Sequence, residues 1–447
     1  MYRTEREGPP DGIRRPPYGA NPALGRHGTR ARREILDVAR RLFGERGYHG
    51  TSVEAIGAAS GRSGAAVYQY FEGKGDLFRV LVAELADEVL AEARALGSMP
   101  WVEAGHAGLD ELQARIRRLS AVVDRHATTL LAWPFAEASE PVLDGSSVRF
   151  LNEYRAAVRP VLVRAGVPED QVGPLALAIG SLVHSAHCTL AERTPDMDPA
   201  RVDAVVARVV YLALFPRDSL GPDAEVAGER PEPPRPPRPA GSRPGPDPAV
   251  EPGVRRRITA RSRPTLERIA AAATIAFCRN GYRGTTLNDV AAEAGVSHGS
   301  VYTYWPDRGS LFSTLAHRAA VALSDHIEAA RPGFASPEEG RAWLSGWLDV
   351  MCTHGAVFHV WTHEVVGDER LGPLAREMTA YVSSFFSALL RSAPAAGSLD
   401  ELPAYLVQWS LLTDLPYTLS VQLGGMSRAE LTGALERLVL RGLLGYP

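Results

Sequence analysis

The stretch from Gly47 to Phe78 reads GYHGTSVEAIGAASGRSGAAVYQYFEGKGDLF, and the stretch from Gly281 to Phe312 reads GYRGTTLNDVAAEAGVSHGSVYTYWPDRGSLF. The two stretches align without a gap and share residues along their whole length. The shared pairs include Gly50/Gly284, Thr51/Thr285, Gly61/Gly295, Ser63/Ser297, Tyr68/Tyr302, Tyr70/Tyr304 and Leu77/Leu311. A repeat this long indicates that the chain of 447 residues carries one module twice.

The sequence around both copies has the periodicity of amphipathic helices. Apolar stripes precede each copy, formed by Ile35, Val38, Ala39, Leu42 and Phe43 and by Ile269, Ala272, Ala273, Ala276 and Phe277. Further helices are predicted over residues 76–96, 108–126, 146–165, 170–192 and 199–214, and again over 307–330, 337–354, 371–392, 399–422 and 427–443. No segment alternates as a strand does, so we predict an all-α protein of two tandem units.

Composition suggests where these units begin and end. Residues 1–27 are rich in Gly, Pro and Arg, which predicts a disordered arm. Residues 217–261 contain many prolines and almost no large apolar residue, which predicts a semi-extended linker. The remaining domains are a first head (28–75), a first helical domain (76–216), a second head (262–308) and a second helical domain (309–447).

Arginines are concentrated at the start of each head, although the net charge of the chain is only −3. The first cluster is Arg30, Arg32, Arg33, Arg40 and Arg41, and the second is Arg255, Arg256, Arg257, Arg261, Arg263 and Arg268. Local basic clusters on a nearly neutral protein favour contact with a polyanion. Charge alone leaves the alternative open that these arginines are simply solvated.

Cysteine usage and hydropathy indicate a soluble cytoplasmic protein. Cys188, Cys278 and Cys352 are far apart, which argues against a disulfide framework and for a reducing compartment. The N-terminus is polar and Pro-rich, without the apolar core of a signal peptide. No apolar run approaches the length that a bilayer requires, so we expect no membrane span.

Each repeated stretch has the layout of a helix-turn-helix. Thr51 is the predicted N-cap of a short helix, and Gly61 ends that helix because glycine accepts a positive φ. Ser63 then caps a second short helix through Tyr68. The twin repeats this order from Thr285 through Gly295 to Ser297. Two short helices joined by a Gly-centred turn are typical of a motif that reads base edges with its second helix.

The two segments resemble the DNA-binding domain of the TetR/AcrR family of bacterial transcriptional regulators. The matched features are Phe-x-x-x-Gly-Tyr at the end of helix one, the Gly-Thr that follows it, the Gly-centred turn, the Tyr-x-Tyr box and the basic residue before Leu-Phe. The motif covers about 50 residues in each half. The resemblance implies that the helices after each head form a ligand-binding and dimerisation domain.

The resemblance also implies roles for individual residues. Phosphate contacts are expected from Thr51, Tyr68, Tyr70 and Lys74 in the first head, and from Thr285, Tyr302, Tyr304 and Arg308 in the second. Base reading is expected from Arg62, Gly64, Ala66 and Gln69, and from His298, Ser300 and Thr303, on helices started by Ser63 and Ser297. For Tyr68 and Tyr302 the alternative is packing in the core.

The first head departs from the family pattern more than the second does. Arg62 stands where Val296 stands in the second copy, so it either reaches DNA or weakens the fold. Gly64, Ala65 and Ala66 leave the first recognition helix few groups that can read bases. Trp305 replaces a phenylalanine and Arg308 replaces a lysine in the second head, and both changes are compatible with function. We therefore expect the second head to be the stronger reader.

The helical domains contain aromatic and histidine residues that could line a ligand pocket, although aromatic residues at this spacing also occur as plain core. The expected lining is Trp133, Phe150, Tyr154 and His184 in the first half and Trp347, His359, Trp361 and His363 in the second, with Phe135, Trp343 and Phe385 as further aromatic positions. His184, His187 and Cys188 share a helix face, as do His359 and His363. This spacing can hold a metal, but further ligands are missing locally, so we predict no metal and no cofactor.

An enzyme is the rival class. The chain has no nucleophile elbow after a strand, no phosphate-binding loop, no dinucleotide fingerprint and no His-Glu-x-x-His motif. We therefore interpret the chain as a DNA-binding transcriptional regulator, a ligand-responsive repressor with two heads. The alternative is a DNA-bridging or protein-interaction scaffold whose first head no longer reads bases.

The partners implied are double-stranded DNA, a small-molecule effector and a second unit. That unit can lie in the same chain, because a linker of about 40 residues spans roughly 35 Å. The helices expected to pair contain Leu175, Leu177, Ile179, Leu182 and Val183 in the first half and Leu402, Leu406, Leu411 and Leu412 in the second. An intrachain pseudo-dimer and a chain dimer with four heads both remain open, with high effective concentration favouring the first.

Overall fold

The structure of the chain is a computed structural model that describes residues 26–99, 105–220, 237–330, 333–365, 367–422 and 426–446. The predicted N-terminal arm falls almost wholly outside these residues, as do residues 221–236 of the predicted linker. Within the described ranges every regular element is helical, which confirms the all-α prediction. The chain divides into two compact units, and each is described by itself.

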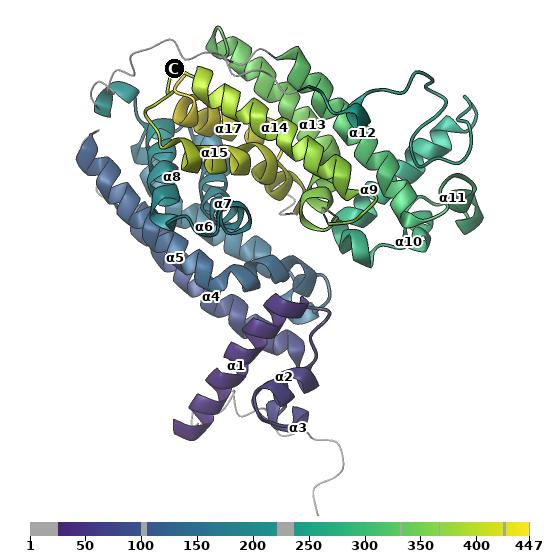
Figure 1. The fold of residues 1–447 in the computed structure, drawn as a ribbon. Helices are drawn as coiled ribbons and strands as arrows, with labels where there is room; N and C mark the ends of the chain where they lie inside the picture. The colour runs from purple at the N-terminus through teal and green to yellow at the C-terminus, as the bar shows by residue number, and fades with distance from the viewer. Residues whose placement is uncertain are drawn as a thin grey trace, which may run out of the picture. The chain divides into compact units, whose positions relative to one another are not determined.

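Unit 1 comprises Met1–Ala91 and Val122–Glu153. Its elements are α1 (Arg26–Arg46), α2 (Val53–Ala59), α3 (Gly64–Val67), the larger part of α4 (Lys74–Gly97), the second half of α5 (His106–Glu137), a short 3₁₀ turn η2 (Pro141–Leu143) and the start of α6 (Ser146–Arg164). The apolar stripe predicted on α1 is buried except for Val38, which is half-buried, and Phe43 stacks on Tyr48 and packs edge-on against Phe78 of α4. This aromatic cluster joins α1 to α4, the first and fourth helices of the head, which are labelled in Figure 1.

Unit 2 comprises Glu92–Ala121 and Tyr154–Pro447, and so contains helices from both halves of the sequence. The first half supplies α7 (Glu169–Arg193), α8 (Pro199–Leu214) and the 3₁₀ turn η3 (Arg217–Leu220). The second half supplies η4 (Ala240–Ser242), α9 (Arg263–Gly284), α10 (Leu287–Glu293), α11 (His298–Tyr304), α12 (Arg308–Ala329), α13 (Pro337–His363), α14 (Gly372–Ser392), α15 (Glu401–Trp409), α16 (Leu415–Tyr417) and α17 (Arg428–Leu435), with π-helical turns η5 (Ser410–Asp414), η6 (Thr418–Gln422) and η7 (Glu436–Leu443).

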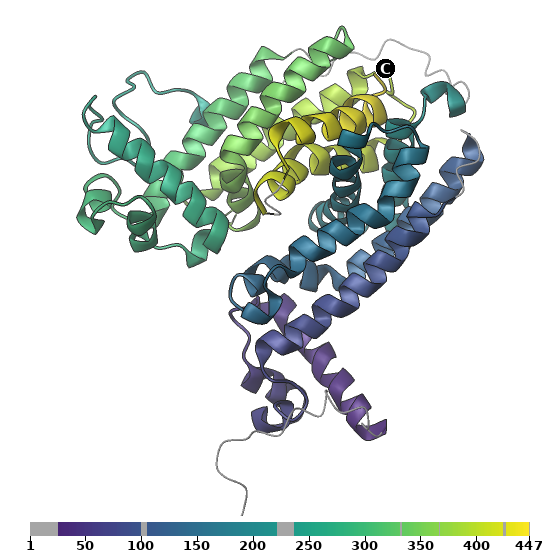
Figure 2. The ribbon, with the colours of Figure 1, turned by 180° about the vertical axis from the view of Figure 1, so that it is seen from behind.

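Helices from the two halves pack directly on one another inside unit 2. α8 lies along η7 and also contacts α15, while α7 contacts α15, α17 and η5 (Figure 2). The predicted pairing residues of α7 are buried, as are Leu406, Leu411 and Leu412. Leu402 is 45% exposed, so its inclusion in this apolar contact was wrong. Leu402 lies in the first turn of α15, where its side chain faces solvent.

Two helices extend well beyond their predicted ends. α5 was expected to stop at 126 and α13 at 354, but they continue to Glu137 and His363. Buried Trp133 and Ala136 prolong the apolar face of α5, and Val360 and Trp361 do the same on α13. Threonines and a proline in α5 and glycine in α13 lower helix propensity at these points, but the tertiary packing of the apolar face outweighs that effect.

α7 is long and apolar enough, by length and composition, to cross a bilayer. This corrects the expectation that no such run exists. In the structure 67% of its most apolar window is buried, and the helix packs against α8, α15 and α17. It has the environment of a core helix.

The second part of the predicted linker is folded onto α12. Arg238 forms ion pairs with Asp325 and Glu328, and the hydroxyl of Ser324 donates to that of Ser242 at 2.9 Å. Ser242 and Ile258 are buried. Composition predicted an extended linker because the segment lacks large apolar residues, but here polar contacts hold it in place.

Candidate nucleic-acid interface and cavity

The second head forms a complete helix-turn-helix. Thr286 caps α10 in a capping box with Asp289, and Gly295 (φ +60°) makes the turn. Ser297 then caps α11, where its hydroxyl accepts from the backbone N–H of Ser300. The buried apolar residues of the two helices fix α10 against α9 and α11 against α10. α11 thus presents its outer face to solvent, as a base-reading helix must.

The first head has the same layout with a shorter second helix. Ser52 caps α2, Gly61 (φ +69°) makes the turn and Ser63 caps α3. α3 contains 4 residues, whereas α11 contains 7. The run Gly64-Ala65-Ala66 favours this difference, because small residues provide few contacts to hold a longer helix.

The prediction that Thr51 and Thr285 are N-caps was wrong. The caps are the next residues, Ser52 and Thr286. Thr51 and Thr285 are only 2% and 1% exposed, and each hydroxyl donates to carbonyls at the end of helix one. These hydroxyls hold helix one to helix two and do not reach solvent. The shared Gly-Thr pair made the buried threonine stand out, whereas the exposed cap differs between the copies.

The tyrosine box is placed on the surface of both heads. Tyr68 and Tyr302 are each 42% exposed, so the alternative of core packing is wrong for them. Tyr70 and Tyr304, two residues further along the chain, are half-buried. The rings of His298 and Tyr302 are in tilted contact, with centroids 4.4 Å apart and an interplanar angle of 54°. Each recognition helix therefore has a tyrosine hydroxyl available to an external partner.

Lys74 and Arg308 occupy one structural position. Lys74 Nζ lies 4.1 Å from the ring centroid of Tyr48 and donates to the Tyr48 carbonyl at 3.1 Å. Arg308 lies 4.3 Å from the ring centroid of Tyr282 and donates to the carbonyls of Arg283 and Thr285. Burial lowers the pKa of Lys74, and the Glu140 carboxylate opposes that shift. Both cations are thus fixed at the start of the fourth helix of their head.

Arg62 does not project freely into solvent. Its guanidinium donates to Glu34 of α1 at 2.7 Å and to the Ser60 carbonyl at 2.7 Å. Hydrogen bonds from Arg62 and then Arg30 hold the pKa of Glu34 below its usual range. The side chain ties the turn to α1, so base reading by Arg62 would require it to leave this pair. The sequence could not reveal Glu34 as its partner, because the two are 28 positions apart.

The groups left for base reading differ between the heads. In the first head Gln69 is exposed, beside the small residues of α3. In the second head His298 is exposed and Ser300 and Thr303 are half-buried. The Thr303 hydroxyl donates to the Gly299 carbonyl at 2.8 Å, and the Ser300 hydroxyl lies 2.8 Å from that of Ser297. The second head therefore offers more polar chemistry along its helix.

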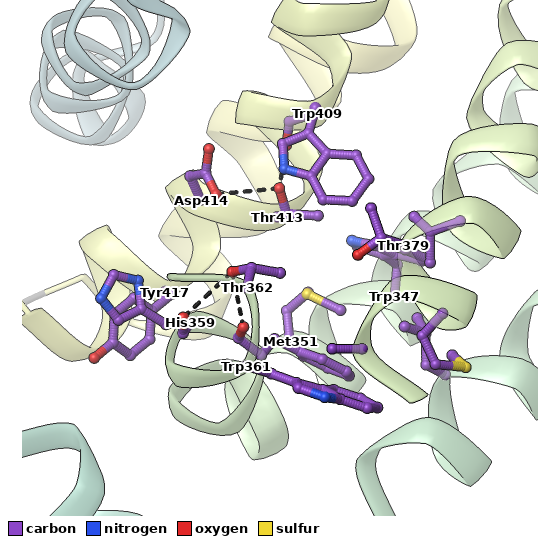
Figure 3. Close-up of a pocket in the computed structure, with 16 residues that line it drawn as sticks. Trp347, Met351, His359, Trp361, Thr362, Thr379, Trp409, Thr413, Asp414 and Tyr417 are labelled. Carbon is purple, nitrogen blue, oxygen red and sulfur yellow. Dashed lines mark hydrogen bonds between the residues drawn. The ribbon is translucent and has the colours of Figure 1, made fainter. Parts of the chain in front are cut away.

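Unit 2 contains an apolar cavity of about 50 Å³ between α13, α14 and the segment from α15 to α16 (Figure 3). Trp347, His359 and Trp361 were predicted to line a pocket, and all three line this one. Further lining comes from Met351, Thr362, Met378, Thr379, Trp409, Thr413, Asp414 and Tyr417, which sequence reasoning did not select. Trp409 and Tyr417 lie eight positions apart in the helix that crosses the cavity, a spacing that could have identified them.

The other predicted lining residues have different surroundings. Trp343 packs on Trp347 and Phe385 behind the cavity wall. In unit 1 Trp133 contacts Phe150 and donates to Ser146, while Tyr154 and His184 belong to unit 2. The side chains of His363 and Phe135 lie outside the described part of the structure.

The histidines on α7 are placed by protein contacts. His187 Nε2 lies 3.0 Å from Asp203 Oδ1, which also accepts from Ser120, and all three residues are buried. His184 lies 3.7 Å from the Cys188 sulfur. Over the described ranges no group of three or more His, Cys, Asp and Glu side chains is arranged to hold a metal ion.

Comparison with known proteins identifies the repeated module. The family model described as "Bacterial regulatory proteins, tetR family" matches residues 35–81 and again 269–315. The repressor AcnR of Corynebacterium glutamicum is 42% identical over 62 residues, so that the match spans 14% of this chain and 33% of AcnR. The repressor Rv1474c of Mycobacterium tuberculosis is 30% identical over 144 residues, which are 32% of this chain and 75% of that protein.

Among solved structures, the TetR family regulator PfmR of Thermus thermophilus aligns over 40% of this chain and 96% of its own, with 19% identity and a TM-score of 0.33. The repeated match to the family model and the length of the match to Rv1474c decide the assignment. The chain belongs to the TetR family of bacterial regulatory proteins, and it carries the family's DNA-binding module twice.

Proposed function

We propose that this chain is a cytoplasmic transcriptional repressor that binds DNA through both of its heads and releases it in response to a small molecule. The observation that carries the proposal is the pair of helix-turn-helix surfaces, each with an exposed tyrosine at its second helix and a cation fixed at the start of the fourth helix. Tyr68, Tyr70 and Lys74, and Tyr302, Tyr304 and Arg308, are the proposed phosphate contacts. AcnR and Rv1474c are both named as transcriptional repressors, which supports the sign of regulation.

We further propose that the two halves of one chain take the place of the two subunits of a dimer. Support comes from the packing of α7 and α8 on α15, α17 and η7, which joins the halves through long apolar helices. Polar contacts reinforce it, since the Thr189 hydroxyl donates to Asp414 and lies 2.9 Å from that of Ser410. A fused pair would read an asymmetric operator, because the base-reading residues of the two heads differ.

The head hypothesis is tested by replacing only exposed groups. His298→Ala/Tyr302→Ala removes the ring pair of the second head, and Tyr68→Ala/Gln69→Ala is its counterpart in the first. Operator affinity should fall on the order of 100-fold for the second-head variant, since base and phosphate contacts are lost together. The measurement is fluorescence anisotropy on a duplex selected by the wild-type chain from genomic fragments.

Lys74→Arg is the matched control, because it copies the cation of the second head and should bind as the wild type does. A smaller loss from the first-head variant would fit its shorter helix. If that variant binds normally while the second-head variant does not, the scaffold alternative is favoured. Normal affinity in both variants would contradict DNA reading by these surfaces.

The ligand response is proposed from the cavity in unit 2. At about 50 Å³ it is far smaller than a pocket of roughly 300–1,000 Å³ that holds a drug-sized ligand. Met351 and Met378 line it, and methionine side chains change shape easily. Trp409, Thr413 and Asp414 reach it from a helix that passes through π-helical turns, which are frequent at functional sites. An apolar small molecule with one hydrogen-bond donor for Asp414 fits this lining.

A route from the cavity to the second head is present. α13, which supplies His359 and Trp361 to the cavity, ends immediately before Glu364. The Glu364 carboxylate accepts from the backbone N–H of Tyr282 at 2.9 Å, at the end of helix one of the head. A ligand that moves the end of α13 would therefore shift the contact that positions the head.

Filling the cavity tests this response. In Ala375→Leu a larger side chain occupies the cavity, so a compound that releases wild-type protein from DNA should release the variant at least tenfold less effectively. Ala380→Leu, on the exposed face of the same helix, is the matched control and should respond as the wild type does. The screen measures DNA release and quenching of the cavity tryptophans across small amphipathic compounds. Equal release of both variants would place the effector site elsewhere.

A further inference from the structure

Residues 247–262, the arm, form an ordered extension of the second head. Arg318 of α12 joins Glu251 of the arm and Glu267 of α9, with N···O distances of 2.8 and 2.7 Å. The Ile258 side chain is buried, and its backbone N–H donates to the Ala249 carbonyl at 2.7 Å. A segment with this anchoring is held in one place before any partner arrives.

The arm is fixed at the end of the recognition helix. The backbone N–H of Arg255 donates to the carbonyl of Tyr304, the last residue of α11, at 2.8 Å. Beside this contact the Thr314 hydroxyl donates to the Pro252 carbonyl at 2.6 Å. The same hydroxyl accepts from Trp305 Nε1 at 2.9 Å, so the helix end and the arm share one buried polar group.

Three consecutive arginines, Arg255, Arg256 and Arg257, are exposed at this contact. Arg257 pairs with Asp247 at 2.6 Å. Arg255 and Arg256 are exposed and take part in no ion pair with the residues that the structure describes. Two cations are therefore presented side by side next to the helix that reads DNA. In this position both cations are well placed for a polyanion bound at α11.

We propose that Arg255 and Arg256 contact the DNA that flanks the bases read by α11, on the side of Tyr304. With α11 in the major groove, the end of the helix lies beside the sugar-phosphate backbone. A segment anchored at that end, as the arm is, lies toward the adjacent minor groove. Arginine favours narrow, A-tract minor grooves because their negative potential is enhanced. This extends the interface of the second head beyond the helix-turn-helix, and it rests on DNA reading by that head.

The arm also gives the two arginine clusters different roles. In the first head Arg30, Arg40 and Arg41 lie on α1 and form ion pairs with Glu34, Glu84 and Glu45. In the second head the exposed pair precedes helix one and has no acidic partner in the described structure. Three of the five arginines in the first cluster are thus paired with glutamates, whereas Arg33, like Arg255 and Arg256, is exposed without an ion pair to a described residue.

The test compares Arg255→Gln/Arg256→Gln with wild type across salt concentrations. The operator duplex is used at full length and also trimmed at the edge of the second head's site on the Tyr304 side. On the long duplex the variant should bind about tenfold more weakly, and the slope of log affinity against log salt should fall by about 2, one per lost contact. On the trimmed duplex wild type and variant should bind alike, because the flank is gone.

Arg341→Gln/Arg376→Gln is the control, since it removes the same charge from exposed sites on α13 and α14. It should bind both duplexes as the wild type does. His298→Ala/Tyr302→Ala separates the two hypotheses, because it should weaken binding to both duplexes. If the arm variant matches the control on the long duplex while the head variant fails, the arm proposal is overturned and head reading stands. If the head variant binds both duplexes normally, DNA reading by α11 is overturned together with the arm.

Discussion

Trp305→Ala is expected to destabilise the second head by about 3–5 kcal/mol, the cost of removing a large buried aromatic side chain. Trp305 is 0% exposed, directly after α11, and it fills the space between the recognition helix and α12. Truncation would also leave the buried Thr314 hydroxyl without its indole donor. Because Thr314 also binds the Pro252 carbonyl, the arm should loosen along with the head.

Hydrogen exchange is the suitable measurement, since a chain with two units need not unfold in one step. Amides of α10 and α11 should exchange at least 100-fold faster than in wild type, while those of α2 and α3 should be unchanged. Trp305→Phe is the matched control, because the equivalent position of the first head is the buried Phe71. It keeps a buried aromatic ring and loses the hydrogen bond together with the pyrrole part of the indole, so its cost should be smaller than that of Trp305→Ala, about 1–3 kcal/mol. Unchanged protection in Trp305→Ala would show that this side chain does not hold the head together.

Gly442→Leu is expected to separate the two halves of the chain at the contact of η7 with α8. A side chain at Gly442 would meet the backbone carbonyl of Val209, on α8, which cannot move aside without shifting the helix. Overpacking against a backbone should cost about 3 kcal/mol. If the halves act as a pair, operator affinity should fall as well, because the heads would no longer be held together.

Gly433→Leu is the control for this prediction. Gly433 lies on α17, and a side chain there would meet nothing within 4 Å. This variant should be as stable as wild type or slightly more so, since glycine is a poor helix former. Chemical denaturation followed by tryptophan fluorescence compares the two variants. Equal stability of both would show that α8 and η7 are not closely packed in solution.

The sequence predicted the helices well because their apolar stripes are long and regular. It placed the ends of α5 and α13 too early, since glycine, threonine and proline lower local propensity while the buried face continues. It treated 237–261 as linker for a related reason. Polar anchors such as Arg238 with Asp325, or Glu251 with Arg318, join residues far apart in sequence, and composition does not reveal them.

In the heads, the resemblance to the TetR family predicted the surface tyrosines and the matched cations Lys74 and Arg308. The errors came from neighbours that the sequence could not supply. Thr51 is a good cap by residue type, yet the fold buries it and exposes Ser52 instead. Arg62 appeared free to contact DNA until the fold placed Glu34 beside it. In the cavity, the aromatic residues of α13 were predicted. The places of Trp409 and Tyr417 depend on how the later helix that carries them crosses the cavity.

The most direct test of a two-headed reader within one chain is the mass of its complex with operator DNA, measured by native mass spectrometry. The duplex is the discrete site protected by wild-type protein, and the complex is examined over a range of chain concentrations. One chain per duplex at saturation, lost in His298→Ala/Tyr302→Ala, is the result we predict. Two chains per duplex at all concentrations would contradict the intrachain pair and establish a dimer with four heads.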